Sequence, residues 1–269
     1  MKTLLLGAAS SVVIFAGAAL AADMPLKAPP PKSTVTSPRW TGCYVGGNAG
    51  WIGGEDRLTL SPGGSLLTSV TAADRAVNTH THEPHGSAFN GGAQAGCNLQ
   101  IRQNWLIGVE GDFNWSGLRE KSFTPYDFIP FATTPGARWD AHNEAVWKSL
   151  NWFSTIRARF GYVWDSVLFY PTAGLAIARI GGRFDYLDTV FGFEFAGSEA
   201  HTRIGPAIGG GVEWAFARNW SVKTEYLYMN FGSFSFDAPP NVPGATIRWG
   251  MAVKASEQIG RVGVNYKFE

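Results

Sequence analysis

The segment from Gly209 to Tyr228 alternates between apolar and charged positions on either side of a two-residue break at Arg218-Asn219. Period-two alternation places neighbouring side chains on opposite faces of a strand, so the segment predicts two β-strands joined by a tight turn. One face is apolar and largely aromatic: Val212, Trp214, Phe216, Trp220, Val222, Tyr226 and Tyr228. The other face carries Glu213, Lys223 and Glu225. This combination is typical of a barrel wall with lipid outside and a small polar lumen inside.

The same alternation predicts eight strands in total, over residues 41–52, 87–101, 105–118, 148–162, 167–184, 202–217, 220–236 and 256–268. Three connections between them are tight, four are long, and the two kinds alternate. Bacterial outer-membrane barrels have an even strand number, short periplasmic turns and long outer loops. We therefore predict an all-β fold, an eight-stranded antiparallel up-and-down transmembrane β-barrel.

The first 39 residues do not belong to this pattern. Residues 1–21 have a lysine, an apolar stretch and a small-residue cleavage site at Ala19-Leu20-Ala21, which predicts a secretory signal peptide. Residues 22–39 are rich in proline and predict an extended periplasmic arm, so that the barrel domain covers residues 40–269. No apolar run of about 18 residues remains after the signal peptide, which excludes a membrane protein built from helices.

Composition supports a barrel and gives no sign of nucleic-acid binding. Hydrophobic residues make up 45% of the chain and aromatic residues 14%, with 33 glycines and 11 tryptophans. Closely packed strands and aromatic girdles at both membrane interfaces account for this excess. The formal net charge of +1 becomes zero once Lys2 leaves with the signal peptide. A neutral chain offers no electrostatic attraction for nucleic acid.

Eight strands enclose a lumen that side chains can fill. In the predicted register the inward charges are Glu110, Asp112, Arg157, Arg159, Glu213, Lys223, Glu225, Arg261 and Lys267, with Asn151 and Thr155 on the same face. Each charge left unpaired there would cost roughly several kcal/mol, so the near balance of signs predicts a salt-bridge network with trapped water. Glu110 and Asp112 could instead form an acid–base pair, but the inward arginines beside them favour membership of the network.

Cys43 and Cys97 are the two cysteines of the chain, near the periplasmic ends of the first two predicted strands. An exported chain folds in an oxidising compartment, so a cross-strand disulfide is one outcome. A pair of free, lipid-facing thiols is the other, because a disulfide tolerates only a narrow range of separations.

All five histidines fall in predicted outer loops, and His80, His82 and His85 lie close together in the first. Imidazoles at these spacings are able to bind Zn²⁺, Cu²⁺ or haem iron. The alternative is a solvated polar loop without the fixed geometry that a metal site needs. We expect no resident cofactor.

Five segments together resemble a known family. They are AADMP at 21–25, WTGCYVGGNAGW at 40–51, NWLIGVEGD at 104–112, NWSVKTEYLY at 219–228 and GRVGVNYKF at 260–268. The chain is similar over essentially its whole length to the alphaproteobacterial outer-membrane immunogenic proteins, which are small porin-like surface barrels of the OmpA-like transmembrane type. The resemblance implies an abundant envelope protein, antigenic at its loops and without catalytic residues. Some relatives are described as haem binders. It also implies that Tyr266 and Phe268 form the assembly signal, although Glu269 follows the terminal aromatic residue here.

These observations predict a structural surface protein of the outer membrane of a Gram-negative bacterium, contributing to envelope integrity and presenting antigenic loops, and not an enzyme. Two alternatives remain open: a narrow porin-like passive channel, and a surface receptor for haem or metal built on the histidine loop. The expected partners are outer-membrane lipids and lipopolysaccharide, the barrel assembly machinery, and host or surface ligands at the outer loops.

Overall fold

The computed structural model describes residues 40–54, 56–64, 71–77, 79–130, 138–188, 194–244 and 246–268. The predicted signal peptide (1–21) and periplasmic arm (22–39) lie outside the described residues. Among the described residues, no helix is long and apolar enough to span a membrane.

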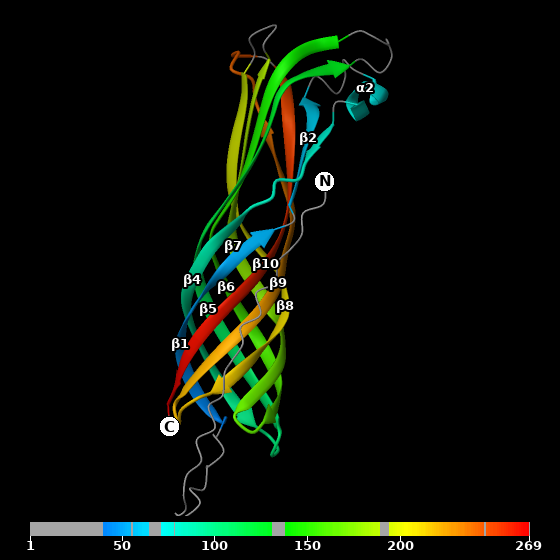
Figure 1. Ribbon diagram of the computed structural model, residues 1–269. Coiled ribbons are helices and arrows are strands. Elements are labelled where there is room, and N and C mark those ends of the chain that lie inside the picture. The colour runs from blue at the N-terminus through cyan, green and yellow to red at the C-terminus, as the bar shows by residue number, and fades with distance from the viewer. Residues whose placement is uncertain are drawn as a thin grey trace, which may run out of the picture. The chain divides into compact units, whose positions relative to one another are not determined.

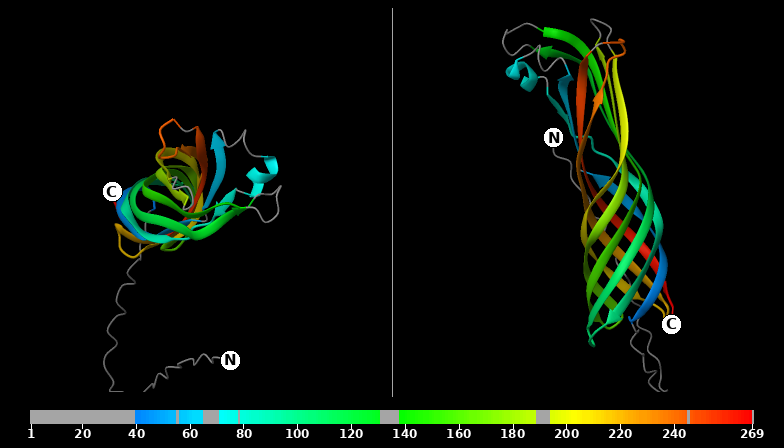
Figure 2. Two further views of the ribbon diagram at one scale, coloured as in Figure 1. Left: turned by 90° about the horizontal axis from the view of Figure 1, so that it is seen from above. Right: turned by 180° about the vertical axis from the view of Figure 1, so that it is seen from behind.

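Eight long antiparallel strands form a closed ring, in which each strand pairs with the next along the chain (Figure 1). One half consists of β1 (Gly42–Gly54), β4 (Ser87–Gln100), β5 (Trp105–Pro130) and β6 (Arg138–Trp164). The other half consists of β7 (Val167–Asp188), β8 (Glu194–Ala215), β9 (Trp220–Ala238) and β10 (Ile247–Lys267). Pairing of β1 with β10, from Tyr44↔Lys267 to Gly54↔Glu257, closes the ring around a common interior (Figure 2). The predicted eight-stranded up-and-down fold is confirmed.

The alternation seen in the sequence sorts side chains between lipid and lumen as predicted over the lower part of the ring. Trp51, Trp115 and Trp164 are 66%, 64% and 70% exposed on the outer wall. Glu213 and Lys223 of the β8–β9 hairpin are buried inside. The sequence left the inward face of β7 undecided, and the structure assigns it to the even-numbered positions from Leu168 to Tyr186.

The strands continue well beyond the predicted ends on the side away from the tight turns. Most of the predicted loops 119–147, 185–201 and 237–255 are strand, which corrects their assignment as irregular connections. Outside the membrane the outer face of a strand need not be apolar, so the period-two signal is lost there although the hydrogen-bonded ladder goes on.

The predicted first loop, 53–86, also prolongs the wall. β2 (Arg57–Gly64) pairs with β10 in the register of β1, since Arg57↔Lys254 follows Gly54↔Glu257. β3 (His80–His82) pairs with β2 in the same register in which β4 pairs with β1. The short helix α2 (Ala72–Val77) lies at this end, away from the turns (Figure 1).

Two β-bulges change which positions face inward. Register shifts place an extra residue in β6 between Leu150 and Trp152, and another in β9 opposite the Ala255/Ser256 step. Gly232 has φ of 70° at the β9 bulge, a conformation that glycine adopts at little cost. Asn151, predicted to face the lumen, is the extra residue of β6 and is exposed. Between the bulge and the turn end of β6, odd-numbered residues such as Phe153 and Arg157 face inward. On the other side of the bulge, even-numbered residues such as Lys148 and Leu150 face inward instead.

The interior is layered rather than uniformly polar. An apolar cluster at the turn end contains Trp40, Leu106, Val163, Leu168 and Tyr170. A larger one fills the middle, and includes Leu150, Phe153, Ile180, Leu227 and Met229. A third, including Leu60, Phe184, Tyr186 and Trp249, fills the outer end. Charged groups occupy the levels between these clusters, so apolar side chains fill the lumen alongside the charges that the sequence placed there.

Truncating Phe153 to Ala should lower the free energy of unfolding by about 3–5 kcal/mol, because the middle apolar cluster would keep a cavity. Phe123→Ala, on the outer wall where the ring is exposed, is the matched control and should cost far less. Urea unfolding of protein refolded in lipid vesicles, followed by tryptophan fluorescence, measures both values. Equal losses would contradict a tightly packed interior.

Candidate functional site

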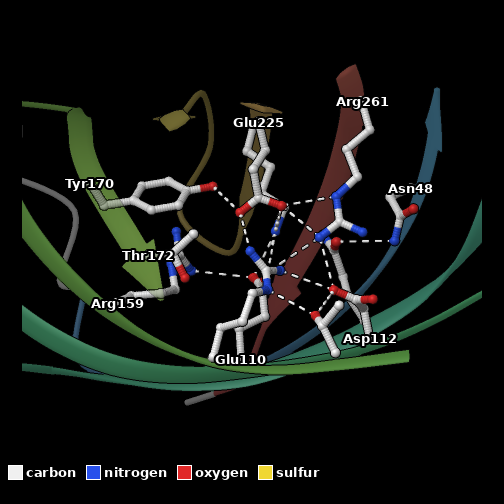
Figure 3. A network of polar contacts seen from close by, with 12 residues as sticks. Asn48, Glu110, Asp112, Arg159, Tyr170, Thr172, Glu225 and Arg261 are labelled. Atoms are coloured by element: carbon white, nitrogen blue, oxygen red, sulfur yellow. Dashed lines mark hydrogen bonds and ion pairs between the residues drawn. The ribbon is translucent and has the colours of Figure 1, made fainter. Parts of the chain in front are cut away.

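The lower charged layer lies between the apolar cluster at the turn end and the middle cluster. It contains four cations and four carboxylates, all at most 5% exposed: Arg157, Arg159, Lys223, Arg261, Glu110, Asp112, Glu213 and Glu225. Strand register places three pairs of opposite charges directly across from each other, as Glu110↔Arg157, Glu213↔Lys223 and Glu225↔Arg261. Figure 3 shows five of them, Glu110, Asp112, Arg159, Glu225 and Arg261, converging from different strands.

Arg157 is the centre of this layer. Its Nη2 donates to Glu110 Oε1 at 2.8 Å and to Asp112 Oδ2 at 2.9 Å, and its Nη1 donates to Glu225 Oε1 at 2.9 Å. Its Nε donates to Thr155 Oγ1 at 2.8 Å. The guanidinium fork therefore connects three carboxylates at once, which a lysine could not do with the same geometry.

The other cations complete the layer. Arg261 donates to Glu225 Oε2 at 2.5 and 2.8 Å and to Asp112 Oδ2 at 2.9 Å. Lys223 Nζ lies 2.6 and 2.7 Å from the two oxygens of Glu110. Arg159 donates to Glu213 Oε2 at 2.6 Å. Each carboxylate thus meets at least one cation, and the structure brings together eight of the nine charges that the sequence placed in the lumen.

Lys267, the ninth, lies half-buried one step nearer the turn end, beside Trp40 and Asn219. Tyr266 and Phe268 lie on the outer wall at the same end, where Tyr266 packs against Trp220 and Phe268 with ring centroids 5.1 and 5.5 Å apart. Cys43 and Cys97 face each other across β1 and β4 and are joined by a disulfide on the exposed side of the wall.

The sequence missed two neutral members of the layer, Tyr44 and Tyr170, whereas Thr155 and Asn265 lie on the inward face that it predicted. Tyr44 donates its hydroxyl to Glu110 Oε2 at 2.6 Å and accepts from Arg159 Nη1 at 2.5 Å. Tyr170 donates to Glu225 Oε1 at 3.1 Å, and its ring lies 3.9 Å from the Arg159 guanidinium. Asn265 donates to Glu213 Oε1 at 2.9 Å. The alternation of β1 and β7 was weak, so nothing in the sequence marked these two tyrosines as inward.

An upper charged cluster lies between the middle and outer apolar clusters. Lys148 Nζ contacts Asp56 and Glu257, and lies 3.8 Å from Glu120 Oε2, with all four side chains fully buried. Trp115 and Trp152 mark the outer aromatic girdle, so this cluster lies beyond the membrane-spanning part of the strands. Asp56 and Glu120 fell in predicted loops, and the bulge that turns Lys148 inward left no signal in the sequence.

Three carboxylates around one lysine cannot all be ionised without cost. Burial, with Asp56 and Glu257 close by, raises the pKa of Glu120 to about 9. Burial likewise raises the pKa of Glu257 to about 7, against the opposing attraction of Lys148. At neutral pH the cluster therefore holds Glu120 as a neutral acid.

Two of the three histidines proposed as metal or haem ligands converge on Glu144 of β6. His80 Nδ1 lies 3.1 Å from Glu144 Oε2, and His82 Nε2 contacts Glu144 Oε1. His85 is exposed in the connection between β3 and β4. Within the part of the chain that the structure describes, no group of three or more His, Cys, Asp or Glu side chains is arranged to hold a metal ion. The histidines instead tie the β3 segment to the wall.

Comparison with known proteins identifies relatives over the whole chain. The family model of the outer membrane protein beta-barrel domain matches residues 9–268. The chain is 30% identical to the 31 kDa outer-membrane immunogenic protein of Brucella melitensis, with 100% of both chains covered. It is 28% identical to the 22 kDa outer membrane protein of Rhizobium leguminosarum over 57% of each chain.

Among solved structures, OprG of Pseudomonas aeruginosa aligns at 9% identity, covering 87% of this chain and 99% of its own, with a TM-score of 0.42. The outer membrane protease OmpT of Escherichia coli aligns at 8% identity, covering 84% and 97%, with a TM-score of 0.48.

Replacing Arg157 with Met should cost about 3–5 kcal/mol of unfolding free energy, because Glu110, Asp112 and Glu225 would each lose a buried partner. Arg183→Met removes an arginine of the exposed pair with Asp185 and should cost less than about 1 kcal/mol. Arg157→Lys keeps the charge without the fork and should fall between them. Denaturant unfolding in vesicles measures all three, and equal losses for Arg157→Met and Arg183→Met would refute a central role for Arg157.

Replacing Glu120 with Gln should flatten the pH dependence of stability. The pKa of Glu120 is about 9 in the folded chain against an ordinary 4.5, so unfolding releases a proton between these values. The wild type should therefore lose stability as the pH rises from about 5 to about 9, and Glu120→Gln should lose less. Unfolding at a series of pH values tests this, with the exposed Glu199→Gln as control. Identical slopes for wild type and Glu120→Gln would show that the wild-type carboxyl is ionised throughout.

Proposed function

Because this chain belongs to the outer membrane protein beta-barrel family, we propose that it is a closed structural barrel that stabilises the envelope and presents its outer hairpins at the cell surface. Its location is the outer membrane of a Gram-negative bacterium, as for the relatives named as outer-membrane proteins. A structural and surface role is in keeping with relatives that are named as immunogenic proteins.

The observation that carries the proposal is the filled interior. Glu110, Arg157 and Lys223 are at most 1% exposed, so their side chains are shielded from solvent. The side chains that line an open pore are in contact with solvent along its length. Here the charges are bound to each other, and the middle cluster with Phe153, Leu227 and Met229 lies next to them along the barrel.

The alternative to a closed structural barrel is a narrow passive channel. Conduction would require Arg157 and Arg261 to leave their carboxylates and the middle apolar cluster to part, and both steps expose unpaired charge or apolar surface. The third candidate is a haem or metal receptor, which would use His80 and His82 as ligands. Both imidazoles are in contact with Glu144, so binding would require them to exchange that partner for the metal.

Assembly and membrane contacts complete the proposal. Tyr266 and Phe268 would be recognised by the barrel assembly machinery, and the exposed apolar wall would contact outer-membrane lipids and lipopolysaccharide. The outer hairpins are the surface available to host or other extracellular ligands.

Planar bilayers containing the purified full-length protein should show no sustained single-channel conductance. Heat-modifiable gel mobility of the same preparation verifies that the barrel is folded, so that a lack of conductance is not caused by a lack of folded protein. A double replacement, Arg157→Ser with Phe153→Ala, removes a central cation and a ring of the middle cluster, and should raise the frequency of open events. Steady open conductance of the wild type would overturn the closed barrel in favour of the channel.

A further inference from the structure

We propose that a basic patch on the outer wall, formed by Arg119, Lys121, Arg179 and Arg183 around Trp147, binds the phosphorylated headgroup of an outer-leaflet lipid. The proposal rests on the outer-membrane orientation of the barrel and adds a defined lipid site to it. The patch covers neighbouring strands β5, β6 and β7, on the surface opposite the buried upper cluster.

Strand pairing assembles the patch. Lys121, Trp147 and Arg183 are direct cross-strand neighbours, through Lys121↔Trp147 and Trp147↔Arg183. In the next outward-facing row toward the membrane Arg119 pairs with Ser149, and below that Arg179 pairs with Trp152 of the outer girdle. The buried neighbours Leu118, Glu120 and Phe184 fix the direction of Arg119, Lys121 and Arg183 away from the interior.

Trp147 holds two of the cations in place. The Lys121 ammonium and the Arg183 guanidinium each lie 5.2 Å from its ring centroid, within the range of a cation–π interaction. A depression of about 570 Å³ beside the ring is lined by Arg119, Trp147, Ser149, Gly181, Arg183 and Glu199, among others. Glycine at 181 and serine at 149 leave this space open between long basic side chains.

The height of the patch matches a headgroup. Arg119 and Lys121 follow Trp115 by four and six residues along β5. Because the β5 register shifts between Trp115 and Leu118, the height is better counted on β7, where the rows of Arg119 and Lys121 lie two and four residues beyond the partner of Trp152. At roughly 3.3 Å per residue along a tilted strand, these rows lie about 5–10 Å beyond the outer aromatic girdle. Aromatic rings mark the level where acyl chains meet the polar region, so cations just beyond them are placed to meet phosphate groups.

The charge of the patch favours an anion. Among the described side chains, four cations stand against two nearby carboxylates, which leaves a net positive charge. Asp185 accepts from Arg183 of the patch itself at 2.8 and 3.1 Å, and Glu199 lies 2.8 Å from His201. Arg119 and Arg183 line the hollow, and Lys121 lies beside it over Trp147. Arginine forks bind phosphate through paired hydrogen bonds, and a lysine adds a mobile positive charge. The anionic lipids of an outer leaflet carry phosphate on a sugar headgroup anchored by acyl chains, and the apolar wall below the patch suits those chains.

The test compares two sets of three substitutions in the full-length, folded protein. Arg119→Gln, Lys121→Gln and Arg183→Gln together remove most of the patch. Arg57→Gln, Arg248→Gln and Lys254→Gln together remove three exposed cations from the β2–β10 wall and serve as the matched control. The probe is bisphosphorylated lipid A in detergent, with fully dephosphorylated lipid A and inorganic phosphate as comparisons. Binding is measured by native mass spectrometry and by the change in tryptophan fluorescence, after heat-modifiable mobility has shown that each variant is folded.

The patch variant should bind bisphosphorylated lipid A about tenfold or more weakly than the wild type, and the control variant about as well as the wild type. Dephosphorylated lipid A should bind the wild type as weakly as the phosphorylated lipid binds the patch variant. Equal losses in both variants, or binding that ignores phosphorylation, would overturn the proposal. Full competition by millimolar inorganic phosphate would also overturn it, because the site would then recognise free phosphate rather than a lipid. None of these outcomes bears on conductance, so the proposed lipid site and the proposed closed barrel are tested independently of each other.

Discussion

Opposite charges that face each other across neighbouring strands hold the wall of this barrel in register. Glu110 stands opposite Arg157, Glu213 opposite Lys223 and Glu225 opposite Arg261 only in the observed pairing, and the first and third of these are direct ion pairs. Because side chains alternate with period two, a slip of one residue would turn a strand's charges outward into lipid. A basic side chain near the middle of a bilayer costs roughly 2–4 kcal/mol, and its abandoned partner inside would cost more. The ion pairs therefore specify register together with the apolar pattern, even where they add little net stability.

Two kinds of contact in the layered interior determine stability and strand register. Burial of side chains such as Phe153, Leu227 and Met229 supplies non-directional stabilisation, while the charged layers on either side supply direction. Tyr44 and Tyr170 belong to both, since their rings lie against Arg159 and their hydroxyls reach carboxylates. Apolar clusters and charged layers therefore alternate along the interior of the barrel.

How much of this could be predicted depended on where lipid enforces a pattern. Below the outer girdle the alternation of Trp105, Ile107 and Val109 against Glu110 and Asp112 revealed strands, faces and eight of the charged residues that meet in the lower layer. Above it, Arg119 and Lys121 point outward where lipid would demand apolar side chains, so the continuing strands looked like loops. The extra residue Asn151 reverses the facing of β6, and no local sequence feature distinguishes it from a regular strand position. The upper cluster of Lys148, Asp56, Glu120 and Glu257 was therefore beyond prediction, because it depends on that bulge and on a hairpin far away in the sequence.

The continuation of the strands past the membrane changes what the cell surface presents. Neighbouring stretches of β5, β6 and β7 form one stiff ribbon, held by main-chain hydrogen bonds on its flanks and by the apolar cluster of Phe184, Tyr186 and Trp249 beneath. An antibody that binds above the basic patch meets residues from three strands at once, because Phe123, Ala145 and Asp185 pair across β5, β6 and β7. Its epitope is therefore conformational, and a linear peptide copied from residues 119–147 lacks most of the shape that such an antibody recognises.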